Sequence, residues 1–180
     1  MTDGDGTIGT DRLREALHAL SSDDRDVRRP WAGTPAAWWH DGTLGPDVAS
    51  TVGTVLSWCA MVDDDAGGVR AELLGSLAVL AKDGQVPEAD LDRLVTGMDA
   101  QWNPENERPH AETLRAALGR KASGQRPRKG YYWTLVDHVH ALTSPDEAER
   151  RGAVDPAANE LGVAPADAQA LAVLSGWATA

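Results

Sequence analysis

The sequence lacks the residues on which several large classes of protein depend. Phenylalanine is absent, and Cys59 is the single cysteine among 180 residues. One cysteine cannot form an intrachain disulfide, which excludes disulfide-stapled scaffolds. No apolar run approaches the roughly 18 residues of a membrane-spanning helix, and the acidic N-terminus lacks the apolar segment of a signal peptide. We therefore expect a cytoplasmic protein that does not act at a membrane.

Positive charge is also scarce. The chain has 17 lysines and arginines against 28 aspartates and glutamates, a net charge of −11. Because phosphate contacts need cations, binding of nucleic acid along the whole chain is disfavoured, whereas a basic protein partner is suited. Residues 108–130 are the exception, with Glu112 as their only acidic residue. The cations of this segment are Arg108, Arg115, Arg120, Lys121, Arg126, Arg128 and Lys129.

What the sequence does contain is a recurring turn signal. A glycine precedes a proline by three or four residues at four places. Glycine readily ends a helix, and proline is tolerated in the first turn of the next one. Residues 27–42 also align without a gap with residues 69–84. The four prolines, Pro46, Pro87, Pro127 and Pro165, are separated by 41, 40 and 38 residues.

The apolar residues between these turns follow helical periodicity, and no segment alternates with the period of a strand. We predict four helical hairpins after an N-terminal helix at 11–20, in a single domain over 11–180 with a flexible segment at 1–10. The first helix of the first hairpin should be short, since Pro30 and Pro35 interrupt it. The second helix of unit two carries an apolar stripe that ends at Trp102. The predicted units span 24–60, 66–102, 107–143 and 144–178.

Paired helices with a period of about 40 residues resemble the HEAT and armadillo repeat proteins. The resemblance covers roughly residues 11–178 and rests on the pattern of turns and stripes. It implies an all-α fold, a right-handed α-α superhelix of about four hairpins. The alternative is an irregular helical bundle in which similar turns recur by chance.

Three groups of residues could carry chemistry, and the sequence favours a structural role for each. Cys59 belongs to an apolar stripe, as expected of a buried thiol. His138 and His140 are two residues apart, so one helix points them in different directions, and we expect no metal site. The acidic cluster 63–65 lacks the spacing of a calcium loop and reads as an exposed helix cap. We expect neither catalytic residues nor a cofactor.

A candidate binding surface lies on the second helices of the hairpins. Trp133, Asp137 and His140 are spaced to share a helix face directed away from the apolar stripe, and second helices often line the concave side of a solenoid. Packing of Trp133 against a neighbouring unit is an equally good interpretation. Trp39, beside Trp38, raises the same question, with packing favoured. The corresponding faces of the other units would present Thr54, Ser57, Arg93, Thr96 and Ala100.

The leading hypothesis is a non-catalytic protein-binding repeat protein. In size and charge the chain is similar to small bacterial HEAT-like immunity proteins, which implies an antitoxin-like or adaptor role with a partner such as a basic toxin. The alternative resembles HEAT-like DNA glycosylases and would contact phosphates with the basic segment. A helical enzyme using Asp63, Asp65 or His138 is a third possibility that no spacing supports. The candidate anion contacts are Arg120, Lys121, Arg126, Arg128 and Lys129.

Overall fold

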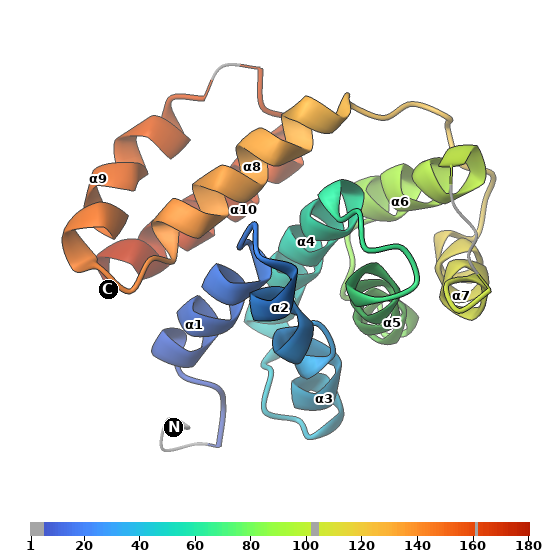
Figure 1. The fold of residues 1–180 in the computed structure, drawn as a ribbon, viewed down its shortest axis with the longest axis horizontal. Coiled ribbons are helices and arrows are strands. Elements are labelled where there is room, and N and C mark those ends of the chain that lie inside the picture. The colour runs from blue at the N-terminus through green and yellow to red at the C-terminus, as the bar shows by residue number, and fades with distance from the viewer. Residues whose placement is uncertain (1–5, 102–104, 161) are drawn as a thin grey trace.

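The computed structural model describes residues 6–101, 105–160 and 162–180, and these segments are helical without a β-strand (Figure 1). This confirms the all-α prediction. The predicted stripe residue Trp102 lies outside the described residues, as do residues 1–5 of the N-terminal segment. The helices are α1 (Thr10–Leu20), α2 (Arg25–Arg28), the 3-10 helix η1 (Arg29–Trp31), α3 (Thr34–His40), α4 (Pro46–Val62), α5 (Val69–Lys82), α6 (Glu88–Gln101), α7 (Arg108–Leu118), α8 (Lys129–Leu142), α9 (Glu147–Ala158) and α10 (Pro165–Thr179).

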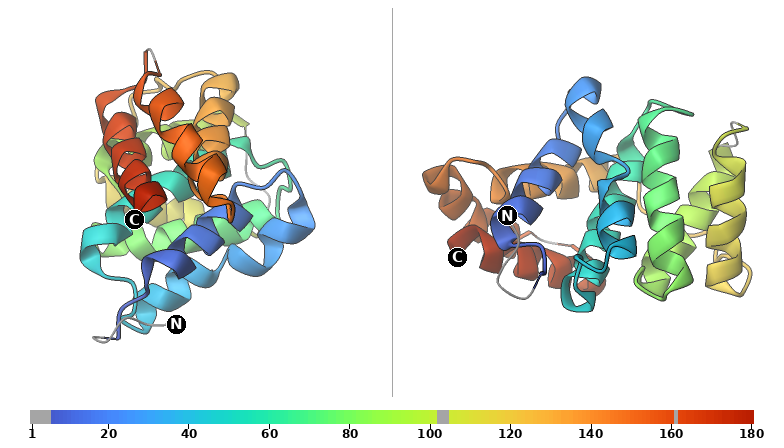
Figure 2. Two further views of the ribbon diagram at one scale, coloured as in Figure 1. Left: turned by 90° about the vertical axis from the view of Figure 1, so that its left-hand side faces the viewer. Right: turned by 90° about the horizontal axis from the view of Figure 1, so that it is seen from below.

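The helices of the N-terminal two thirds are stacked side by side. α5 packs between α3 and α7, and α4 packs on α6, so that two layers form (Figure 2, right). The short α3 agrees with the prolines that interrupt this region, since Pro35 lies at its first turn. Helix α4 of the first predicted unit packs against α5 of the second, and α6 of the second packs against α7 of the third. These contacts connect each unit to the next.

Helix α4 is the centre of the core. It packs against α5, α6, α8 and α10, and contacts α1 as well. A helix with neighbours on all sides must be apolar all round, and every residue from Thr51 to Val62 is buried. Trp58, near its C-terminal end, is fully buried. Polar residues on this helix, such as Thr54 and Ser57, are therefore in the interior and not on a concave surface.

The third predicted unit differs from the prediction. Its first helix, α7, packs on α5 and α6, while its second helix, α8, crosses back to α4, α9 and α10 (Figure 1). Gly119, with φ of +68°, ends α7, and the segment 119–128 then carries the chain across to α8. The third Gly–Pro signal, Gly124 and Pro127, thus lies inside a connection instead of a tight hairpin turn.

The other three turn signals act as predicted. Gly42, Gly84 and Gly162 have φ of +70°, +71° and +81°, a region that residues with a Cβ rarely adopt. Pro46 and Pro165 occupy the first positions of α4 and α10. Among the described residues, no helix is both long and apolar enough to cross a membrane.

Candidate functional site

A cleft opens where the α4–α5 loop faces the N-terminal end of α8. We call this hollow, with a volume of about 560 Å³, the cationic cleft. A smaller hollow of about 80 Å³ adjoins it and shares Asp63 and Asp64 with it, and Trp133 lies at this second hollow. The cationic cleft is lined by Met61, Asp63, Asp64, Arg70, Arg126, Pro127, Arg128, Lys129 and Tyr132.

Buried ion pairs fix the α4–α5 side of the cleft. Asp63 is buried and accepts a hydrogen bond of 3.0 Å from Arg28 Nε. Arg70 donates from Nε to Glu107 over 2.8 Å, and from Nη1 to the backbone oxygen of Asp63 over 3.2 Å. The prediction of an exposed cap is therefore wrong for Asp63, which the neighbouring arginine draws into the interior. Only Asp64 of the acidic cluster is fully exposed at the rim.

Asp65 has the capping role that was predicted for the cluster. Its Oδ2 accepts from the backbone N–H of Val69, the first residue of α5, over 2.9 Å. A carboxylate here satisfies an N–H that the helix leaves unpaired. This bond and the ion pairs hold the α4–α5 loop in place, so Asp65 has a structural role.

The opposite side of the cleft comes from the basic segment, which is held to α6. Arg120 pairs with Glu88 and with Asp92, at 2.9 and 2.8 Å. Asp92 also accepts from the N–H and hydroxyl of Ser123. Burial acts to raise the pKa of Asp92, but the bonds from Ser123 and Arg120 outweigh it and hold this pKa below its usual value. The positive charge of Arg120 is thus balanced by two carboxylates, and Lys121 is exposed beside it.

Three cations of this segment remain for a ligand. Arg126, Arg128 and Lys129 line the cleft, and within the described part of the chain none of them forms an ion pair. Gly97 of α6 permits the close approach of Arg126, because a Cβ there would lie 3.2 Å from Arg126 Nη1. With Asp64 as the exposed carboxylate opposite them, the cleft is positive in a chain whose net charge is −11.

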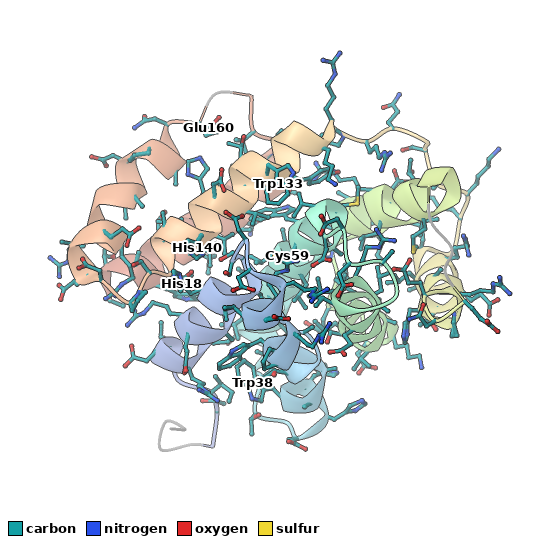
Figure 3. The ribbon with its side chains drawn as sticks, in the orientation of Figure 1. His18, Trp38, Cys59, Trp133, His140 and Glu160 are labelled. Atoms are coloured by element: carbon teal, nitrogen blue, oxygen red, sulfur yellow. The ribbon has the colours of Figure 1, made fainter. Side chains whose placement is uncertain are left out.

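The predicted face of α8 is only partly exposed. Trp133 is 38% exposed and Asp137 is exposed, so both lie on the surface as predicted. His140 does not, because its ring stacks on His18 of α1 with 3.9 Å between centroids (Figure 3). Helix α1 covers this end of α8, which the sequence pattern could not show.

The predicted surface residues of α6 lie in the interior. Thr96 is buried, and Arg93 donates from Nη1 to both carboxylate oxygens of Asp167 over 2.9 Å. Helix α10, which carries Asp167, packs on α4 and is linked to α6 by this ion pair. Thr96 is therefore corrected from a surface to an interior residue, and Arg93 to a partly buried residue held in an ion pair; the side chain of Ala100 lies outside the described set.

Trp39 is used for packing, as the sequence favoured. Its Nε1 donates to Asp83 Oδ2 over 2.7 Å and joins α3 to the C-terminal end of α5. Trp38, its neighbour, meets Trp31 edge to face at 6.5 Å between centroids. The two adjacent indoles thus contact different partners, and both are partly buried against the core.

Cys59 is a buried thiol. Desolvation raises its pKa to about 12, and the nearby charge of Asp63 acts in the same direction. We expect the native protein to react with a thiol reagent at about pH 8 at least roughly a thousandfold more slowly than a free cysteine, because so little thiolate forms. Ellman's reagent measures this rate. The unfolded protein in concentrated guanidinium chloride is the control and should react fully, while rapid labelling of the folded protein would contradict the burial.

The histidines of α8 give no metal site. His138 lies 3.2 Å from Glu160, and His140 is turned toward α1. Across the described ranges, no group of three or more histidine, cysteine or acidic side chains is arranged to hold a metal ion.

Sequence reasoning missed the buried cluster around Asp167, whose members come from α4, α6, α8 and α10. No spacing in the sequence marks these residues as neighbours.

Comparisons with protein families, with curated proteins and with solved structures found no match to the chain. Function is therefore inferred from the cleft and its residues.

Proposed function

We propose that the protein is a non-catalytic binding protein of the helical-repeat type that recognises a partner protein through the cationic cleft. One observation carries the proposal: three cations that pair with no described carboxylate gather near an exposed tryptophan, in a chain that is otherwise acidic. Tryptophan and arginine are the residues that most often dominate binding energy at protein interfaces. The positive cleft suits an acidic segment of the partner.

An immunity, antitoxin-like or adaptor role in the cytoplasm fits this proposal. The negative remainder of the chain would steer a basic partner, such as a toxin, to the complex at a high rate. A HEAT-like superhelix is the fold that we propose for the repeat region. The stacking of α3, α5 and α7 in one layer, and of α4 and α6 in the other, supports it.

A charge-reversal experiment tests the proposal. We expect the variant R126E/R128E/K129E to bind the partner recovered from the native host at least about tenfold more weakly than the unchanged protein. The matched control K82E/R108E/R151E alters net charge equally at exposed positions away from the cleft. Isothermal titration calorimetry with the purified pair compares them, and equal losses in both variants would show that net charge, not the cleft, is recognised.

Nucleic acid is the second candidate, favoured by the same three cations beside an aromatic side chain. Single strands bind where bases stack on an aromatic ring and phosphates meet cations. Three phosphate contacts would give a slope of about −2 for log affinity against log salt concentration. Fluorescence anisotropy with a labelled single-stranded oligonucleotide measures it. Binding with this slope, lost in R126E/R128E/K129E, would favour nucleic acid over the protein partner.

A further inference from the structure

Two distant segments of the chain have nearly the same sequence. Residues 18–29 read HALSSDDRDVRR and residues 140–151 read HALTSPDEAERR, with identity at seven of twelve positions. Each segment contains the end of one helix, α1 or α8, and the start of the next, α2 or α9. The offset of 122 residues is close to three of the intervals between turn signals.

The two segments also share their internal hydrogen bonds. Arg28 Nη1 donates to the backbone oxygens of Ser22 and Asp23, both over 2.9 Å. Arg150 Nη1 donates in the same way to the two residues that correspond, Ser144 and Pro145, over 2.8 and 3.1 Å. Each arginine therefore holds the turn between its two helices.

The segments meet at a local two-fold arrangement. His18 and His140 stack, and each Nδ1 lies near the backbone oxygen of the other residue, at 3.0 and 3.2 Å (Figure 3). Since a carbonyl oxygen only accepts, each of these contacts is a hydrogen bond when the Nδ1 of that ring carries the proton. This reciprocity makes the surroundings of Arg28 and Arg150 directly comparable.

The comparison reveals one difference. Arg28 Nε donates to Asp63 over 3.0 Å, and Arg70, which also binds a preceding turn through Nη1, donates from Nε to Glu107 over 2.8 Å. Arg150 is 9% exposed, yet its Nε has no hydrogen-bond partner, and within the described segments it forms no ion pair. A buried guanidinium without a carboxylate is costly.

An open hollow lies at Arg150. Its volume is about 550 Å³, against about 80 Å³ for the hollow at Arg28. The two hollows are lined by corresponding residues. Asp11 and Arg14 line the hollow at Arg150, and the residues 122 positions later, Trp133 and Val136, line the hollow at Arg28. At Arg28 the end of α4 occupies this space. At Arg150 no described residue takes the place of the end of α4, and the walls include Val27 and Trp31.

The charges around this hollow favour an acidic occupant. Arg14 pairs with Asp11, and Glu15 pairs with Arg12. Of the described acidic and arginine side chains that line the hollow, Arg150 is therefore the one without an ion pair. The apolar walls suit an aliphatic side chain, since Val27 is 43% exposed and Trp31 only partly buried.

We propose that the hollow at Arg150 binds an acidic peptide segment of a partner protein. A carboxylate of the segment pairs with the guanidinium of Arg150, as Asp63 pairs with that of Arg28, and the preceding aliphatic residue contacts Val27 and Trp31 as the end of α4 fills the other hollow. This site lies apart from the cationic cleft and does not depend on it.

A peptide titration tests the proposal without altering the protein. The probe is acetyl-Met-Val-Asp-amide, which copies the end of α4, and its matched control carries Asn in place of Asp. We expect saturable shifts of the Nε–H resonance of Arg150 and the indole N–H of Trp31 in nitrogen-15 NMR spectra. The Asn peptide should bind at least about tenfold more weakly, because a charge-assisted bond is lost.

Four further results bear on the occupant. Equal affinity for the two peptides, or no shift of either resonance, overturns the proposal. Acetate as effective as the peptide would assign the hollow to small carboxylates, and shifts that depend on protein concentration alone would assign it to a second copy of the chain. Either outcome contradicts a peptide site.

Variants separate this site from the cleft. V27E introduces at an exposed position the residue that the second segment has there, Glu149, and should weaken peptide binding about tenfold without unfolding the protein. R151Q, at the exposed neighbour of Arg150, should leave binding unchanged. R126E/R128E/K129E should also leave it unchanged, so failure of the proposed cleft function and failure of this site give different results.

Discussion

Replacing Asp167 by alanine should lower the free energy of unfolding by about 3–5 kcal/mol, the usual cost of removing one partner of a buried ion pair. Asp167 is fully buried. Its carboxylate accepts from Arg93 at 2.9 Å, from Trp58 Nε1 at 3.2 Å and from the hydroxyl of Tyr131 at 2.5 Å. The substitution removes the acceptor of the guanidinium, the indole N–H and the phenol hydroxyl, and it leaves Arg93 with its longer contact to Asp90, at 3.7 Å. Since domains are stable by only about 5–15 kcal/mol, this is a severe loss.

Urea denaturation followed by circular dichroism measures the effect. The matched control is D155A, which removes an exposed aspartate of α9 and should change the free energy of unfolding by less than about 0.5 kcal/mol. The double variant R93M/D167L removes both charges and should be more stable than D167A. If D167A lost less than about 1 kcal/mol, the carboxylate would not be the link between α6 and α10.

The buried cluster explains why the sequence predicts the helices better than their arrangement. Periodicity showed which side of each helix is apolar, and the glycines and prolines marked most of the ends. An apolar stripe does not say which helix will cover it, so the return of α8 to α4 could not be foreseen. Arg93 and Thr96 looked like surface residues because they are polar, although Thr96 is buried and Asp167, the partner of Arg93, lies 74 residues later in the chain.

The candidate site could be predicted only in part, because the sequence does not show how the helices are arranged. Trp133 and the cations of the basic segment were found because composition alone sets them apart. Their meeting at two adjoining hollows depends on the path of residues 119–128, which the bonds of Asp92 to Ser123 fix. The matching segments at 18–29 and 140–151 are also present in the sequence. They are 122 residues apart, however, whereas the prolines of the turn signals recur at intervals of 41, 40 and 38 residues.

The second large effect concerns Asp90, whose carboxylate is buried in the same cluster. Desolvation raises its pKa to about 6; the charge of Asp167 adds to this, while the hydrogen bond from Thr54 and the charge of Arg93 oppose it. Its Oδ2 accepts from the Thr54 hydroxyl over 2.8 Å, and its Oδ1 has no hydrogen-bond partner. In the unfolded chain the pKa returns to its ordinary value of 3.8.

This difference gives the stability a definite dependence on pH. Between about pH 4 and pH 6 the folded state binds more protons at Asp90 than the unfolded state does, so the contribution of Asp90 to stability falls as pH rises. The full change is about 3 kcal/mol. An uncharged asparagine can still accept from Thr54 and needs no desolvation of a charge. We therefore expect D90N to be about 1–3 kcal/mol more stable than the unchanged protein at about pH 8.

Urea denaturation at about pH 4 and about pH 8 tests this sign. At the lower pH Asp90 is largely protonated in the folded state, so the two proteins should have nearly the same stability. D155N, at an exposed position, should show no difference between the two pH values relative to the unchanged protein. A D90N protein that is less stable at about pH 8 would mean that the charge of Asp90 stabilises Arg93 by more than its burial costs. In that case Asp90 and Asp167 would act as two necessary partners of one arginine.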